Sequence, residues 1–265
     1  MSIDSYGSGV LLVLGSMIAS VVGLLIARKL AHLDHLKATH EVGGYLLSVV
    51  GTMYAVLLGL VVVDAMSRFQ QGISITESEA NSLADVFILS QRMPTERALV
   101  VQRLCHRYAD LVINDEWKKL DSGHISKDAR RTAIELMKAV SNWEPSTESE
   151  KAIYPIAVTE ACQLWDCRRS RTNMSQHCMP PLEWYILIIG GVVTVVFTYF
   201  FGIENLKAQI AMTAMVSMII ALNLFLVMMF GYPFSGELKV APSSFELDKK
   251  IFDDQLGISK LNLVQ

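Results

Sequence analysis

The chain has 265 residues, of which 52% are hydrophobic and 18% are charged, and its formal net charge is −3. Its mean hydropathy of +0.37 is typical of a membrane protein. The polar middle of the chain, residues 66–180, carries equal numbers of basic and acidic residues. This balance excludes a basic nucleic-acid-binding surface.

Four apolar runs are long enough to cross a lipid bilayer. A helix over residues 43–65 reaches roughly 34 Å, which exceeds the hydrocarbon thickness of about 30 Å. The runs occupy residues 9–27, 43–65, 182–202 and 208–231. We predict an all-α, multi-pass membrane protein in which four transmembrane helices form two hairpins that flank a helical extramembrane domain.

These runs divide the chain into four segments. They are a first hairpin over 1–65, an extramembrane domain over 66–180, a second hairpin over 181–231 and a C-terminal tail with a short helix over 232–265. A cleaved signal peptide is the alternative interpretation of the first run. We favour a retained helix, because residues 1–8 contain no Lys or Arg and the basic residues follow the run.

The extramembrane domain has helical spacing and helix-start residues. No proline occurs between Asp64 and Pro94, so we expect the second transmembrane helix to continue to about Arg92. A new helix starts at Pro94 and is expected to end near Trp117. Ser126 is a candidate N-cap for the next helix.

One more helix is expected before the second hairpin. Thr147 and Glu150 have the spacing of a capping box, and the helix should run to about Arg171 with a kink at Pro155. No stretch of the domain shows sustained alternation of apolar and polar residues. The sequence therefore predicts no strand there.

The side of the membrane that this domain faces is only weakly indicated. The first eight residues carry no positive charge, whereas Arg28 and Lys29 follow the first run. Because the first helix usually dominates orientation, this favours an N-terminus and a middle domain outside.

Cysteines and histidines are the candidate metal ligands. Four cysteines lie in the middle domain, namely Cys105, Cys162, Cys167 and Cys178. Two disulfides are expected if the domain is extracytoplasmic, and four free thiols if it is cytosolic. No C-x-x-C pair occurs, and we interpret His32, His35 and His40 as a solvated loop rather than a metal site.

The sequence contains no motif of a known catalytic site. We find no phosphate-binding loop, dinucleotide-binding glycine motif, zinc-protease motif or serine-nucleophile elbow. Cys167 lies beside Arg168 and Arg169, which could lower its pKa, but we interpret it as structural. We predict that the protein is not an enzyme and holds no metal or cofactor.

Small and hydroxyl-bearing residues form a stripe on the second apolar run. On a helical wheel the stripe spans about 100°, and it consists of Gly44, Ser48, Gly51, Thr52, Ala55 and Gly59. Small residues let helices approach closely, and hydroxyls bond across helices or line an aqueous path. We assign Gly44 and Gly51 to helix packing. The hypothesis for Ser48, Thr52, Ala55 and Gly59 is pore lining.

The same face continues beyond the membrane to Glu77 and Asn81, which suits a pore vestibule, although an ordinary bundle seam is the alternative. The first run has its own ladder of small residues, Gly15, Ala19 and Gly23, for which we predict helix packing.

Two polar features near or in the membrane have local explanations. Asp64 and Arg68 are spaced for an i,i+4 ion pair. Asn223 lies inside the fourth apolar run, where we expect its amide to bond to another helix.

Several stretches, taken in order, resemble a known family. They are YLLSVVGTMYAVLLGLVVVDA, ESEANSLADVFILSQRMP, NDEWKKLDSG, DCRRSR, MPPLEWYIL and GYPFSGELKVAPSSFE. Their order and spacing, over about residues 10–247, resemble the bacterial bestrophin-like membrane family. Bestrophins are homopentameric anion channels, so the resemblance implies an oligomeric channel in the bacterial inner membrane, with the second helix lining the pore and a cytosolic middle domain.

The chain departs from bestrophins in two places. Ser48, Thr52 and Ala55 stand where the resemblance implies a bulky aromatic neck, and the tail has only Asp253-Asp254 in place of an acidic calcium-binding run. A ring of Glu77 side chains would favour cations.

Two classes of function follow. The first is a homo-oligomeric channel that passes inorganic ions through the bilayer. The second is a non-conducting membrane scaffold or envelope sensor whose helical domain binds a partner.

Overall fold

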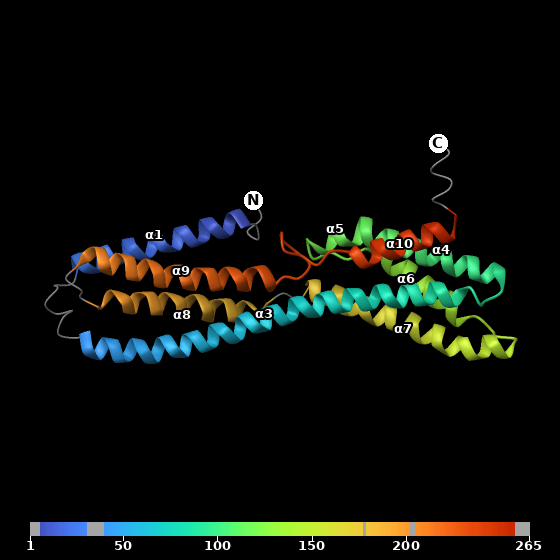
Figure 1. Ribbon diagram of the computed structural model, residues 1–265, viewed down its shortest axis with the longest axis horizontal. Helices are drawn as coiled ribbons and strands as arrows, with labels where there is room; N and C mark the ends of the chain where they lie inside the picture. Colours follow the sequence, from blue (N-terminus) through green and yellow to red (C-terminus); the bar gives the residue numbers. More distant parts are fainter. Residues whose placement is uncertain (1–5, 31–39, 177–178, 202–204, 258–265) are drawn as a thin grey trace, which may run out of the picture. The chain divides into compact units, whose positions relative to one another are not determined.

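The computed structural model describes residues 6–30, 40–176, 179–201 and 205–257, and the regular structure within these ranges is entirely helical. This confirms the predicted all-α fold. Figure 1 labels the helices in chain order. The chain divides into two compact units. The membrane unit contains α1, the first part of α3, α8 and α9, and the helical unit contains the second part of α3, α4 to α7 and α10.

Four helices among the described residues are long and apolar enough to cross a membrane. They are α1 (Tyr6–Leu30), α3 (His40–Ser90), α8 (Pro181–Tyr199) and α9 (Leu206–Phe230). Each contains most or all of one predicted run, and α8 ends three residues before the expected boundary. Within the membrane unit, α1 runs alongside α9, and both contact α8 (Figure 1).

The two helices of the second hairpin start as their sequences dictate. Pro181 occupies the first turn of α8, where its missing N–H group costs no hydrogen bond. Asn205 caps α9, because its side-chain oxygen accepts hydrogen bonds from the backbone N–H groups of Lys207 and Ala208.

Helix α3 is continuous from His40 to Ser90, as the absence of proline predicts. It ends two residues before the expected Arg92, in a turn where the Met93 N–H donates to the Ser90 carbonyl. The Asp64–Arg68 pair is also confirmed, with Arg68 Nε 2.7 Å from Asp64 Oδ2.

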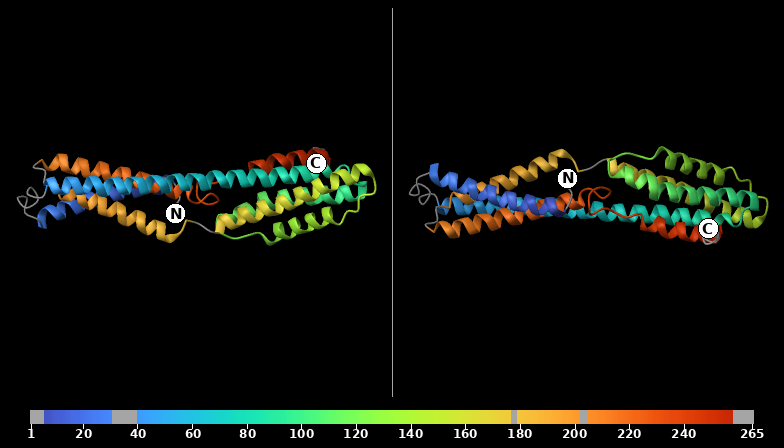
Figure 2. Two further views of the ribbon diagram at one scale, coloured as in Figure 1. Left: turned by 90° about the horizontal axis from the view of Figure 1, so that it is seen from below. Right: turned by 90° about the horizontal axis from the view of Figure 1, so that it is seen from above.

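The helical unit is built from six further segments. They are α4 (Thr95–Leu111), the π-helical turn η1 (Val112–Glu116), α5 (Trp117–Leu120), α6 (Lys127–Ser141), α7 (Glu148–Gln176) and α10 (Ser243–Gln255). Figure 2 shows α10 lying along the second part of α3. Helix α6 packs between α4 and α7.

Two predicted helix starts in this unit are confirmed. The Ser126 side chain accepts a hydrogen bond from the Ala129 N–H. Thr147 and Glu150 exchange the two hydrogen bonds of a capping box.

Two predicted helix ends are wrong. The helix that starts after Pro94 does not stop near Trp117, because η1 and α5 carry the helical path on to Leu120. Helix α7 continues past Arg171 to Gln176, with Pro155 inside it. Its anchored side chains Arg168, Arg171 and Thr172 are buried, and the helix runs on for one further turn.

Asn223 corrects another expectation. Its amide donates to the carbonyl of Ile219 on its own helix, 2.9 Å away, rather than to another helix. A carbonyl one turn back is always within reach of such a side chain, so no partner helix is needed.

The core of the helical unit is aromatic. Phe87 of α3 stacks on Phe252 of α10 with 4.2 Å between ring centroids, and Trp117 contacts the edges of Phe234 and Phe245. The Trp117 Nε1–H group donates to the carbonyl of Val240. These contacts fix the segment that follows α9 against α3 and α5.

Candidate functional site

The four predicted pore residues of the membrane span lie on a face of α3 that the rest of the described chain leaves uncovered. Ser48, Thr52, Ala55 and Gly59 are all exposed. A methyl group on Gly59 would meet no atom within 4 Å. The Thr52 hydroxyl donates to the Ser48 carbonyl at 2.7 Å, so its hydrogen is satisfied within the helix while its oxygen remains an acceptor.

Different residues of α3 pack inside the membrane unit. Tyr54 and Leu58 are buried, and they belong to a cluster with Leu187 and Val227. The Tyr54 hydroxyl donates to the Leu187 carbonyl at 3.0 Å. The Tyr54 ring lies where a side chain at Gly190 would have to go. Close helix approach in this unit therefore depends on the glycines of α8.

The small residues assigned to packing have unequal surroundings. A methyl group on Gly15 or Gly51 would meet nothing within 4 Å, and one on Gly44 would meet only the Phe201 ring at 3.7 Å. Gly23 differs, because the Tyr199 hydroxyl oxygen would be 2.6 Å from such a methyl group.

Ala19 is exposed. It lines the groove between α1, α8 and α9.

Outside the apolar span, α3 has two sharply different faces. Glu77 and Asn81 are exposed, as a vestibule requires. Glu79 and Leu83 are completely buried in the helical unit. Residues 77 and 79 are separated by about 200° around a helix, so burial of Glu79 directs Glu77 away from the unit.

A network of four buried charges holds Glu79 in place. Arg171 binds Glu79 through two nitrogens, at 2.6 and 2.9 Å, and binds Glu116 at 2.9 Å. Arg168 binds the other oxygen of Glu116 at 2.6 Å. All four side chains are at most 3% exposed. Two carboxylates balance two guanidinium groups, so the network has no net charge.

Two aromatic groups complete this network. The Tyr108 hydroxyl donates to Glu79, and the Trp117 ring centroid lies 4.8 Å from the Arg171 guanidinium carbon. Burial raises the pKa of Tyr108 well above its usual value, and the Glu79 carboxylate raises it further. Burial alone would lower the pKa of Arg171, but Glu79 and Glu116 raise it above its usual range. Tyr108 is therefore a permanent donor and Arg171 a permanent cation.

Sequence reasoning missed this network. Its members are far apart in the chain, and each looks like a surface charge on a polar helix. The available signal was the pair Arg168 and Arg171, which follow Leu164 by four and seven residues and so share a helix face with an apolar residue.

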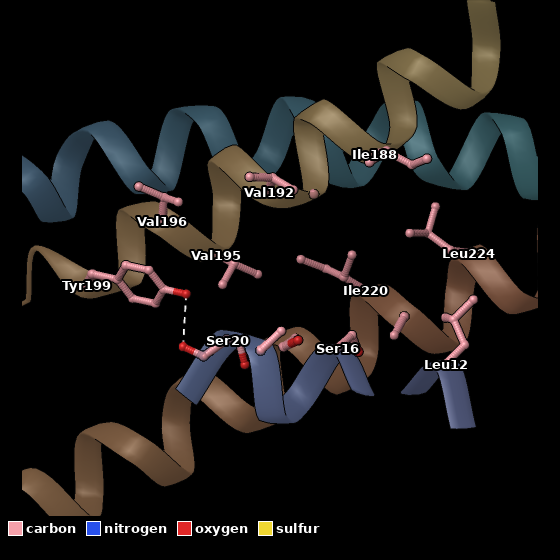
Figure 3. Close-up of a pocket in the computed structure, with 14 residues that line it drawn as sticks. Leu12, Ser16, Ser20, Ile188, Val192, Val195, Val196, Tyr199, Ile220 and Leu224 are labelled. Carbon is pink, nitrogen blue, oxygen red and sulfur yellow. Dashed lines mark hydrogen bonds between the residues drawn. The ribbon is translucent and has the colours of Figure 1, made fainter. Parts of the chain in front are cut away.

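An apolar groove lies between α1, α8 and α9 in the membrane unit (Figure 3). Its volume is about 280 Å³, and its walls are mostly aliphatic with a few hydroxyl groups. Tyr199 donates a hydrogen bond to the Ser20 carbonyl across one end, at 2.9 Å. No lining residue is charged, so the groove offers a hydrated ion no countercharge.

Comparison with known protein families identifies the family of this chain. A family model described as the bestrophin-like domain matches residues 14–245. The chain belongs to the bestrophin-like family. No curated protein sequence matches it significantly.

The bestrophin-like fold is also seen in solved structures. A crystal structure of a bacterial bestrophin homologue from Klebsiella pneumoniae has a TM-score of 0.70 and 11% identity, over 92% of this chain and 98% of that chain. Two single-substitution mutants of that homologue have TM-scores of 0.71 and 0.69, with 10% and 11% identity, over 92% of this chain and 99% of theirs. This likeness shows the fold.

The three cysteines within the described part of this bestrophin-like chain are free thiols. Cys105 is a buried free thiol, Cys162 is exposed and Cys167 is half-buried, while Cys178 lies outside the described residues. The alternative of two disulfides is therefore wrong. Burial raises the pKa of Cys167 first, and the charge of Glu79 raises it further, so it is not an activated thiol. The loop residues His32 and His35, and the His40 side chain, lie outside the described residues.

Proposed function

We propose that this bestrophin-like protein is a homo-oligomeric ion channel of the bacterial inner membrane, with α3 nearest the symmetry axis. The observation that carries the proposal is the uncovered face of α3, where Ser48, Thr52, Ala55 and Gly59 are all exposed and a methyl group on Gly59 would meet no atom of the described residues within 4 Å. Symmetry-related copies of this face would enclose a path through the membrane.

Lipid alone does not account for such a face. Acyl chains offer no hydrogen bonds to hydroxyl groups and gain nothing from glycine, so small and polar residues collect where helices or water meet them. Packing within the chain is excluded at Gly59, since nothing lies within 4 Å of its position. The partners left are a second copy of the chain and water.

The polar continuation of this face supports water over a closed seam. Glu77 and Asn81 are exposed on α3 beyond the apolar run. Carboxylates repeated by symmetry around an axis would raise the local concentration of cations. We therefore propose that cations are the conducted ions.

The first test is assembly together with conduction. The full chain is purified into lipid nanodiscs for mass measurement and into liposomes for ion flux under an applied voltage. We expect a closed ring, a pentamer as the family resemblance implies, and a cation flux. A strict monomer or dimer without flux would refute the channel and leave the non-conducting scaffold as the function.

Bulky substitutions separate a pore wall from a packed seam. Gly59→Leu and Ala55→Phe should block conduction while leaving assembly intact, because a pore wall has space before it. At a packed seam the same changes would overpack the interface, at a typical cost of about 1–3 kcal/mol, and the oligomer would dissociate.

A matched control lies on another face of the same helix. Met53 is also exposed, at about 160° from Ala55 around the helix. Met53→Phe should therefore leave both conduction and assembly unchanged. Equal loss of conduction in Met53→Phe and Ala55→Phe would mean that the position on α3 does not matter, which contradicts a pore at this face.

A further inference from the structure

Helix α10 is seated on the helical unit by two aromatic side chains and several polar contacts. Phe245 and Phe252 are buried, and Phe252 stacks on Phe87 of α3. The polar contacts join α10 to α4 and to the turn after α3: Lys249 with Asp110, Asp253 with His106, and Gln255 with Gln91.

Asp248 differs from the other polar residues by which α10 contacts the helical unit. It lies between Phe245 and Phe252 on the buried face of α10 and is 9% exposed. Its Oδ2 atom is inaccessible and has no hydrogen-bond partner. A buried carboxylate in this position opposes docking whenever it is ionised, because it has lost water without gaining a donor.

No positive charge compensates Asp248. The group that faces it from α3 is Asp85, another carboxylate. On α4, Asp110 pairs with Lys249 and His106 pairs with Asp253. Lys249, the basic residue next to Asp248 on α10, therefore already binds another carboxylate.

The acidic groups of η1 do not change this balance. Asp115 pairs with Lys119, and Glu116 pairs with Arg168 and Arg171. Burial, followed by the charge of Asp85, raises the pKa of Asp248 from 3.8 to about 6.

We propose that α10 is a proton-dependent latch, which docks more tightly on α3 and α4 as Asp248 takes up a proton. Protonation of Asp248 removes the uncompensated charge from the interface. Acidification therefore closes the latch.

The direction and the size of the pH effect on α10 docking follow from the linkage between proton binding and docking. The docked state holds the Asp248 proton more tightly than the undocked state, so docking is favoured below the docked pKa of about 6 and is progressively lost as the pH rises through it. Between pH 7.5 and pH 5, Asp248 alone should raise the docking constant about tenfold.

The latch is tested by hydrogen–deuterium exchange on the full chain in nanodiscs, with rates corrected for the pH dependence of intrinsic exchange. Protection of the α10 amides should rise about tenfold from pH 7.5 to pH 5. In Asp248→Asn, α10 should be well protected at both pH values, and most of the pH dependence should be lost. Protection of the α6 amides reports whether each variant is folded.

One further variant keeps the test decisive if Asp248→Asn fails to fold. Asp85 is exposed, so Asp85→Asn is tolerated; it should raise α10 protection at pH 7.5 and move the transition to lower pH. The control is Asp254→Asn, an exposed change on the same helix that should behave as the wild type.

The proposal is overturned if α10 protection does not depend on pH, falls on acidification, or keeps its full pH dependence in Asp85→Asn. The readout is helix docking, so it is independent of whether the protein conducts ions.

Discussion

Two glutamates on α3, separated by one residue, show how much the environment of a side chain decides its role. Glu77 is exposed, whereas Glu79 is 0% exposed and receives three hydrogen bonds from Arg171 and Tyr108. The buried carboxylate fixes the rotation of α3 about its own axis. The exposed one is thereby held on the opposite side of the helix.

Removing the buried carboxylate should be costly. Glu79→Ala leaves Arg171 buried with only Glu116 to balance it, and loss of one partner of a buried ion pair typically costs about 3–5 kcal/mol. We expect this loss in denaturant unfolding of the full chain in detergent. Glu77→Ala is the control and should change stability by less than about 0.5 kcal/mol.

An apolar replacement tests the origin of that cost. In the double variant Glu79→Leu/Arg171→Met no unpaired charge remains at this pair, so a large part of the stability should return. If the double variant were as unstable as the sum of the two single changes, the cost would arise from lost packing instead.

At the scale of one helix, Gly72 lets another segment approach α3. A methyl group at this position would lie 3.0 Å from Pro233 Cβ and 3.5 Å from Phe234 and Val240. Gly72→Leu should therefore push this segment away and destabilise the helical unit by about 1–3 kcal/mol, despite the better helix propensity of leucine.

The displacement has its own signal. Trp117 contacts Phe234 and donates a hydrogen bond to Val240, so its fluorescence should change in Gly72→Leu. Gln71→Leu places the same side chain on an exposed neighbour and should change neither stability nor fluorescence. Equal stability of the two variants would show that the close approach at Gly72 is not needed.

Local signals were sufficient to predict most helices. Ser126, and the pair Thr147 and Glu150, cap helices because their hydrogen bonds reach only three residues along the chain. The absence of proline gave the continuity of α3. The prediction failed for Asn223, because the choice between a partner helix and the carbonyl of Ile219 depends on the neighbours of α9 rather than on its sequence.

For the candidate site, sequence patterns identified the face of α3 but not what holds it. Ser48 and Gly59 were recognised from spacing on one helix. The contact of Glu79 with Arg171 joins residues separated by 92 positions in the chain, and no periodicity links them. A glutamate or arginine in a buried ion pair is the same residue type as one exposed to water. Its burial therefore cannot be predicted until the packing of the helices is known.

At the scale of the whole molecule, four apolar helices that each cross the membrane once would leave both termini on the same side of it. The family resemblance implies a cytosolic middle domain. We therefore propose that the helical unit and both termini face the cytosol, against the orientation that the charges around the first run favour.

Single-thiol labelling tests this topology. The four native cysteines are replaced, and Ser5→Cys or Ile258→Cys is introduced one at a time. In intact spheroplasts, each thiol should resist a membrane-impermeant maleimide. Each should react after the membrane is permeabilised. Labelling of one position from outside and the other only from inside would contradict four spans. Labelling of both from outside would keep the four spans and reverse the orientation.

The π-helical turn η1 also limits how this chain can change in length. A π turn holds one more residue than the α turn that would replace it. Deleting the exposed Asn114 would let an α turn replace the π turn, and Glu116 would keep nearly the same direction relative to α4, toward Arg168 and Arg171. Homologues that keep the two arginines should therefore tolerate the loss of one residue within 112–116, whereas deletion of a second residue would rotate Glu116 by about 100° and separate it from the arginines.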